Sequence, residues 1–297
     1  MVENPVSDAL APLTKQLGRL CDRQPFMTSW FLEDLRSGAT ADRDGDRETP
    51  SASTRKVGIM MATLRAVHQG RLDLDQPVVI DERFREEIYS GCLQHLTPGL
   101  TMPLRDAVAL MIIVSDNLCT PHVVELVGLD AVNAFCENVG LHRTHHRNAI
   151  IGRLEPDHPL DATNSTSAAD QARLYRLILQ GALDPQTAAI LGCSPTLCAL
   201  ALDILHGQLY RDGIAALLPP MTPMATKNGL GWRDVSDGGI VFDGDDPAFI
   251  LTVYTDQVPE TLPDGLPGTA VARGLIADLG RACWEHIVLT RREPATS

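Results

Sequence analysis

Ser53 to Lys56 (STRK), Ser115 to Asn117 (SDN) and Lys227 to Gly229 (KNG) are the three stretches that decide how this chain folds. Residues three positions apart on a helix share a face, so the Lys56 amine is expected beside the Ser53 hydroxyl. A serine hydroxyl is a weak nucleophile until a neighbouring base takes its proton. Lysine can be that base when burial or nearby cations favour its neutral form. The first motif alone is common, but three motifs in this order indicate a serine nucleophile.

The order of the motifs resembles that of the class A β-lactamases and penicillin-binding proteins, serine enzymes that react through an acyl-enzyme. Other segments support the resemblance. Residues 26–38 (FMTSWFLEDLRSG) are similar to the family's first strand and turn, residues 96–101 (LTPGLT) to the segment before its SDN helix, and residues 239–254 to its last two strands. The resemblance covers roughly residues 10 to 287.

The resemblance implies an α/β fold, in which an antiparallel sheet is flanked by helices and an all-helical lobe is inserted. We expect residues 1–48 and 210–297 to form the α/β sandwich domain and residues 49–209 the inserted helical domain. The catalytic residues would then lie between the two lobes, a common place for ligand sites.

Hydrophobic periodicity predicts the individual elements. Helices are expected at residues 8–23, 53–70, 103–114, 116–139, 167–181 and 268–287, and a further helical stretch follows residue 181 and ends at about residue 208. Strands are expected at residues 30–35, 224–227, 238–242 and 248–255, and loops at residues 37–50 and 142–164.

The composition is that of an ordinary globular protein. Of the 297 residues, 44% are hydrophobic and 21% charged, and the net charge is −13. This acidic balance, without a Lys/Arg-rich run, argues against nucleic acid or an anionic membrane as a partner. No apolar run is long enough to span a membrane. The resemblance implies a small-molecule substrate, and the oligomeric state stays open.

The start of the chain and the cysteines bear on localisation. Residues 1–5 (MVENP) lack the basic start and apolar core of a secretory signal, so the chain is expected in the cytoplasm, or outside it if a signal has been removed. The cysteines show no disulfide framework and fit reduced thiols. They are seven: Cys21, Cys92, Cys119, Cys136, Cys193, Cys198 and Cys283.

The resemblance assigns catalytic roles to the first two motifs. Ser53 would be the nucleophile, Lys56 the base, and Ser115 the group that passes a proton to the leaving group, while Asn117 would contact the substrate. The amides of Ser53 and Leu230 would form the oxyanion hole. The alternative is structural: Ser53 caps a helix, Lys56 reaches solvent, and the SDN motif is a polar kink.

The third motif and Tyr89 would bind substrate. Lys227 would attract a substrate carboxylate and Gly229 would complete the motif, whereas an edge-strand lysine that discourages aggregation is the alternative. Asn228 departs from the family, which usually has Thr or Ser there. Tyr89 would form a cavity wall, or be a half-buried tyrosine with a satisfied hydroxyl.

Deacylation is the open step. A class A β-lactamase activates water with a Glu in a Glu-x-x-x-Asn pattern. Glu155 lies in a similar Arg-x-Glu-Pro context, but Pro159 takes the place of the Asn. Counting without gaps from Ser115 puts the Glu position at Ile151 instead. Glu155 is therefore either the deacylating base or an exposed loop carboxylate.

We expect no cofactor and no metal, and the histidines of the 142–164 loop are interpreted as loop residues: His142, His145 and His146. The sequence thus predicts a serine hydrolase acting on an amide or ester, a β-lactam being one candidate. A peptidase, esterase or acyltransferase of small-molecule metabolism, and a non-catalytic penicillin-binding sensor, are the alternatives.

Overall fold

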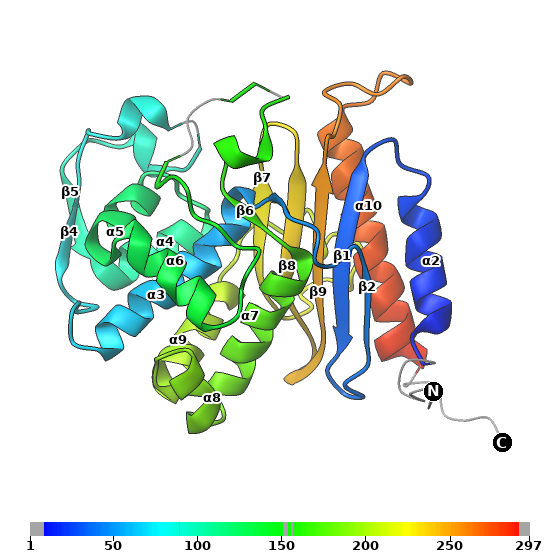
Figure 1. Cartoon of the computed structure of the whole chain (residues 1–297), viewed down its shortest axis with the longest axis horizontal. Coiled ribbons are helices and arrows are strands. Elements are labelled where there is room, and N and C mark those ends of the chain that lie inside the picture. Colours follow the sequence, from blue (N-terminus) through cyan, green and yellow to red (C-terminus); the bar gives the residue numbers. More distant parts are fainter. Residues whose placement is uncertain (1–8, 89, 151–153, 156, 291–297) are drawn as a thin grey trace.

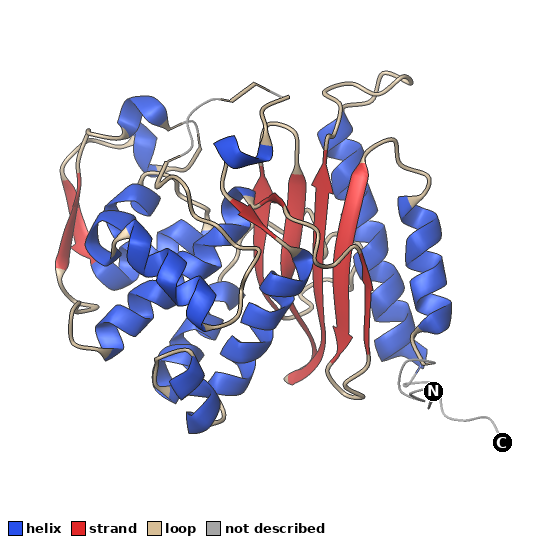
Figure 2. Cartoon of the chain, viewed as in Figure 1, coloured by secondary structure: helices blue, strands red, loops and turns tan. Residues whose placement is uncertain are grey.

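A five-stranded antiparallel sheet forms the centre of the computed structural model, which describes residues 9–88, 90–150, 154–155 and 157–290 (Figures 1 and 2). The strand order is β2-β1-β9-β8-β7, so strands from both ends of the chain lie side by side. The bounds are β1 Met27–Asp34, β2 Thr40–Arg43, β7 Met224–Leu230, β8 Val235–Asp243 and β9 Asp246–Asp256.

Two terminal helices cover one face of the sheet (Figure 1). They are α2 (Ala11–Cys21) and α10 (Gly268–Trp284), which continues as the π-helix Glu285–Leu289. Leu13 and Leu17 of α2 pack with Val253 of the sheet and Leu279 of α10 in one hydrophobic cluster. Successive side chains of a strand point to opposite faces of the sheet. Ile240 and Ile250 therefore belong to a second hydrophobic cluster on the other face, and the sheet is buried on both sides.

The other face is covered by α7 (Ala168–Gly181), beyond which lies a group of helices (Figure 2). They are α3 Lys56–His68, α4 Leu104–Ile113, α5 Cys119–Val127, α6 Leu129–Asn138, α8 Pro185–Ile190 and α9 Pro195–His206. Helix α3 is buried almost all round, because apolar residues occupy several of its faces. Short elements complete this side: η1 Ala52–Arg55, η2 Arg85–Glu87, η3 Leu93–His95, η4 Leu160–Ala162 and the strand pairs β3 Thr49–Pro50 with β6 Ser165–Thr166 and β4 Pro77–Ile80 with β5 Leu100–Pro103.

The predicted fold class is confirmed, and several element predictions are wrong in detail. Residues 37–50, predicted as a loop, contain β2 and β3, and the β4–β5 hairpin was not predicted. These strands are four residues or shorter, which is too short to show periodicity. The helix predicted at 116–139 is divided at Gly128, whose φ of +87° ends α5. The domain boundaries at residues 48 and 210 stay a prediction.

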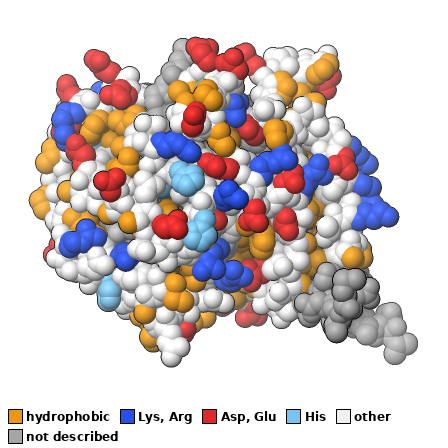
Figure 3. Space-filling view, in the orientation of Figure 1, with side chains coloured by type: hydrophobic (Ala, Val, Ile, Leu, Met, Phe, Trp, Pro, Cys, Tyr) orange, Lys and Arg blue, Asp and Glu red, His pale blue; other side chains and the backbone are white. Residues whose placement is uncertain are grey.

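The surface agrees with the acidic but mixed composition. On the face shown in Figure 3, basic and acidic side chains are interspersed. Among the described residues, no helix combines the length and apolar character that crossing a membrane would require.

Candidate active site

The three motifs meet at one cavity of about 560 Å³. Its wall includes residues from η1, from the start of α3, from the turn after α4 and from the end of β7: Ser53, Lys56, Ser115, Asn117, Asn228 and Leu230. Segments that are more than a hundred residues apart in the sequence therefore contribute polar groups to one space.

Lys56 lies on the floor of this cavity and is 1% exposed. Its Nζ atom is 2.8 Å from the Ser115 carbonyl oxygen, 3.1 Å from Ser115 Oγ and 2.6 Å from Asn117 Oδ1. The alternative in which Lys56 reaches solvent is therefore wrong. The N-cap positions of η1 and α3 are Ser51 and Arg55, so Ser53 is not the cap of either helix.

Burial lowers the pKa of Lys56 well below its ordinary value, and the nearby cations Lys227 and Arg55 lower it further, against the opposing effect of Asp116. A buried ammonium loses its hydration, and neighbouring positive charges disfavour it again. The Lys56 amine is thus shifted toward the neutral form that can accept a proton.

The SDN turn holds Ser115 in a strained conformation with φ of 54°, in the left-handed region that non-glycine residues rarely adopt. Asp116 fixes the turn, because its carboxylate accepts from the amides of Leu118 at 2.9 Å, Cys119 at 3.2 Å and Leu93 at 2.9 Å. The strain is maintained by this buried network. Its effect is to direct both the carbonyl and the hydroxyl of Ser115 toward Lys56.

Lys227 is fully buried on β7, although β7 is an edge strand of the five-stranded sheet. Its ammonium donates to the Asn228 carbonyl at 2.8 Å and to Asn228 Oδ1 at 2.9 Å. Burial lowers the pKa of Lys227 to about 7, and Asp237 opposes the shift. Of the described residues, Asn228 rather than Lys227 lies on the cavity wall. Because Asn228 Oδ1 accepts a hydrogen bond from Lys227, the NH₂ group of the same side chain is the part left to face a ligand.

Glycine is required at position 229 by close packing. A Cβ atom there would lie 2.4 Å from Ser236 Oγ and 3.2 Å from the Ser53 amide nitrogen. Strand β7 consequently passes directly beside the start of η1. This brings Leu230 to the same cavity as Ser53, the arrangement that two amides of one oxyanion hole need.

Arg55 is a functional candidate that the sequence reasoning missed. Its guanidinium donates to the carbonyls of Asn148 at 3.1 Å and Ala149 at 2.7 Å, and the residue is 5% exposed. It therefore joins the segment that carries Ser53 to the 142–164 loop and places a cation near Lys56. Arg55 occupies one of the two unspecified positions of the Ser-x-x-Lys motif, so no signal in the sequence pointed to this role.

The loop residues proposed for deacylation are not brought to the cavity together. Glu155 is exposed and, among the described residues, the loop's cavity wall is formed by Ala149, Ile150, Leu154, His158 and Thr163 instead. The buried His158 ring bonds back to the Glu155 carbonyl at 2.6 Å, which fixes the turn. Ile151 and Tyr89 lie outside the described residues. The role of Glu155 stays a prediction.

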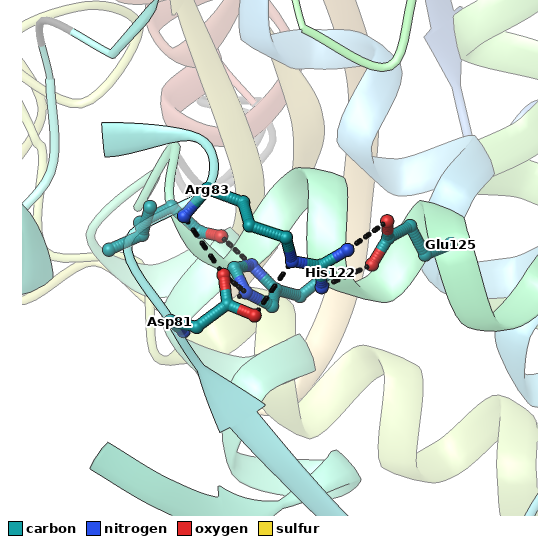
Figure 4. A network of polar contacts seen from close by, with 5 residues as sticks. Asp81, Arg83, His122 and Glu125 are labelled. Carbon is teal, nitrogen blue, oxygen red and sulfur yellow. Dashed lines mark hydrogen bonds and ion pairs between the residues drawn. The ribbon is translucent and has the colours of Figure 1, made fainter. Parts of the chain in front are cut away.

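A charged network links the segment after β4 to α5 (Figure 4). Farther along the same segment, Glu87, Ile88 and Ser90 line the cavity. Arg83 donates to both carboxylate oxygens of Glu125 on α5, at 2.8 and 2.9 Å, and to Asp81 at 2.7 Å. The buried His122 accepts from the Asp81 amide at 3.2 Å. The segment after β4 is thereby fastened to α5.

Comparison with known proteins gives the family. The model of the beta-lactamase enzyme family matches residues 12–287. The chain belongs to the beta-lactamase enzyme family. Its fold is the fold of these serine hydrolases, and no curated protein sequence matches it.

Solved structures of the family superpose over nearly the whole chain. A beta-lactamase from Sphaerobacter thermophilus is 25% identical with a TM-score of 0.77, over 95% of this chain and 98% of that one. PBP-A is 26% identical with a TM-score of 0.77, over 93% and 96%. A PBP-A mutant, solved as its acyl-enzyme complex with penicillin G, is also 26% identical, with a TM-score of 0.75.

Within the described ranges, no group of three or more His, Cys, Asp or Glu residues is placed to hold a metal ion. His146 is buried with neither ring nitrogen hydrogen-bonded to a described residue, and burial lowers its pKa to about 3. His142 pairs with Glu137 at 3.0 Å on the surface.

Proposed function

We propose that this beta-lactamase-family protein is a serine hydrolase that cleaves an amide or ester through a Ser53 acyl-enzyme. The observation that carries the proposal is the buried Lys56, placed between Ser115 and Asn117 on the wall that also holds Ser53. A neutral amine in this position can take the Ser53 proton.

In the proposed reaction, acylation begins at Ser53. The Ser53 hydroxyl gives its proton to Lys56 Nζ while its oxygen bonds to the substrate carbonyl carbon, and the amides of Ser53 and Leu230 stabilise the oxyanion. The C–N or C–O bond then breaks. The proton passes from Lys56 through Ser115 Oγ, 3.1 Å away, to the departing nitrogen or oxygen. Water later releases the acyl group from Ser53.

Persistent penicillin binding is a second candidate function, because the exposed Glu155 leaves the deacylating base unassigned. The similarity to PBP-A, one form of which was solved as an acyl-enzyme with penicillin G, supports considering it.

One experiment distinguishes these functions: the intact mass of the protein is followed over time after mixing with benzylpenicillin. A transient adduct on Ser53 indicates a lactamase, and a persistent one indicates a penicillin-binding protein. With no adduct, serine-directed esters would be the next reagents. An adduct that survives in Ser53→Ala, or maps to another residue, refutes the nucleophile assignment.

A further inference from the structure

Asp234 is a buried acid on the wall of the catalytic cavity that the proposed mechanism does not use. It follows the turn between β7 and β8 and is 2% exposed. Its Oδ2 atom is buried without a hydrogen-bond partner among the described residues. A buried polar atom without a partner costs free energy, so its retention beside a ligand cavity calls for an explanation.

The surroundings of Asp234 lack one positive charge. Arg233 is the neighbouring cation, but its guanidinium pairs with Asp256 at 2.7 and 3.1 Å and also donates to the His158 carbonyl. Asp256 raises the pKa of Asp234 while Arg233 lowers it, and burial raises it most, to about 8. Asp234 and Asp256 therefore share one neighbouring guanidinium group, that of Arg233, which already pairs with Asp256. The chemical complement of this arrangement is a cation.

The position of Asp234 specifies which part of a substrate would meet it. The Gly231 amide donates to the Asp234 carbonyl at 2.9 Å, and a Cβ atom on Gly231 would lie 2.0 Å from Asp234 Oδ1. The carboxyl group is thus folded against Gly231, the residue after Leu230. If a substrate's carbonyl oxygen lies at the Leu230 amide and its acyl side chain runs past Gly231, that side chain reaches this carboxyl group.

We infer that Asp234 forms a subsite for a protonated amine on the acyl side of the substrate, so that the preferred substrates are α-aminoacyl amides or esters. This inference deepens the proposed function and rests on it for the orientation of the substrate. Asp234 is a specificity residue here, since an ammonium group would supply the hydrogen bonds that its carboxyl group lacks and the charge that its surroundings lack.

Asp212 provides a matched control. It lines the same cavity, but its carboxylate pairs with Arg273 at 3.3 Å. Asp212→Asn and Asp234→Asn each replace one carboxyl group in the cavity wall by an amide of the same shape. Only the second removes the acid that has no partner.

The test compares acylation by ampicillin and by benzylpenicillin, which differ only in the α-amine of the acyl side chain. The wild type should prefer ampicillin, and Asp234→Asn should lower this preference by about tenfold to hundredfold, the range of one charge-assisted hydrogen bond. Asp212→Asn should leave the preference unchanged. Equal acylation by the two penicillins in the wild type, or an equal loss for both in Asp234→Asn, overturns the inference.

A binding measurement keeps the two proposals separable. Phenylglycinamide and phenylacetamide represent the two acyl groups without a reactive ring, and their affinities are measured by calorimetry. If neither penicillin acylates Ser53 but phenylglycinamide binds more tightly in an Asp234-dependent manner, the subsite stands and the acyl-enzyme function fails. If the amine gives no gain in affinity, the subsite is refuted whatever the penicillins show.

Discussion

At the scale of single residues, the proposed chemistry depends on one lysine whose charged form is disfavoured. Lys56 is enclosed, faces Ser115 and Asn117, and has two cations among the groups that lower its pKa. A surface lysine with the same hydrogen-bond partners would stay protonated and could not act as a base.

Replacement of Lys56 by Ala should therefore slow acylation of Ser53 by about 10²–10⁴-fold, the usual contribution of general-base catalysis. The rate of adduct formation with a penicillin is measured by mass spectrometry at neutral pH. Thermal unfolding of the variant and of Ser53→Ala checks that both proteins fold. Acylation by Lys56→Ala at the wild-type rate would remove Lys56 from the mechanism.

The lowered pKa of Lys227 predicts that the acylation rate of anionic substrates depends on pH in a way that the rate of uncharged substrates does not. Its pKa is lowered to about 7, so its positive charge is present below that pH and lost above it. The ratio of acylation rates for an anionic penicillin and an uncharged ester should fall by about tenfold as the pH rises through about 7, a change of about 1.4 kcal/mol. The requirement for neutral Lys56 affects both substrates and cancels in the ratio. A flat ratio, or the same slope in Lys227→Met, contradicts this prediction.

At the scale of elements, the site is formed where η1, the SDN turn and β7 meet, and Arg55 joins the first of these to the 142–164 loop. Replacing Arg55 with Leu removes a cation, so the pKa of Lys56 should rise and the acid limb of the acylation profile should move to higher pH. Arg55→Lys keeps the charge but cannot donate in the same forked geometry, so it should leave the limb nearly in place.

Hydrogen exchange separates the two effects of Arg55. In both variants the amides of residues 147–150 should exchange faster, because the bonds to Asn148 and Ala149 are lost or weakened. An acid limb that stays unchanged in Arg55→Leu would show that Arg55 acts on the loop alone.

The elements also show what the sequence could and could not reveal. The spacing of Ser53 and Lys56 predicted a shared face, and the motif order predicted that distant segments meet, because these depend on local geometry and on the resemblance. The carbonyl partners of Arg55 and the unpartnered Asp234 depend on how loops lie across one another. Periodicity carries no information about such contacts. The strands β2 to β5 were not predicted because each is too short to show a periodic pattern.

At the scale of the whole molecule, acylation and deacylation are supported by different parts of the fold. The groups proposed for acylation come from η1, the start of α3, the turn after α4, and β7. The proposed deacylating group, Glu155, comes from the long loop and is exposed. If Ser53 is acylated as proposed, this arrangement favours forming the acyl-enzyme over breaking it.

We therefore expect weak turnover of β-lactams, together with acylation that is readily detected. Hydrolysis of a chromogenic cephalosporin should be slow in the steady state after a burst of about one equivalent, because the acyl-enzyme accumulates. Glu155→Gln should leave the slow rate unchanged, as should Asp157→Asn, which removes another exposed carboxylate from the same loop. If Glu155→Gln instead traps the acyl-enzyme while Asp157→Asn does not, the loop must close in the acylated state and Glu155 is the base. Unchanged deacylation in both variants points to Lys56, which would then activate water once the leaving group has taken its proton.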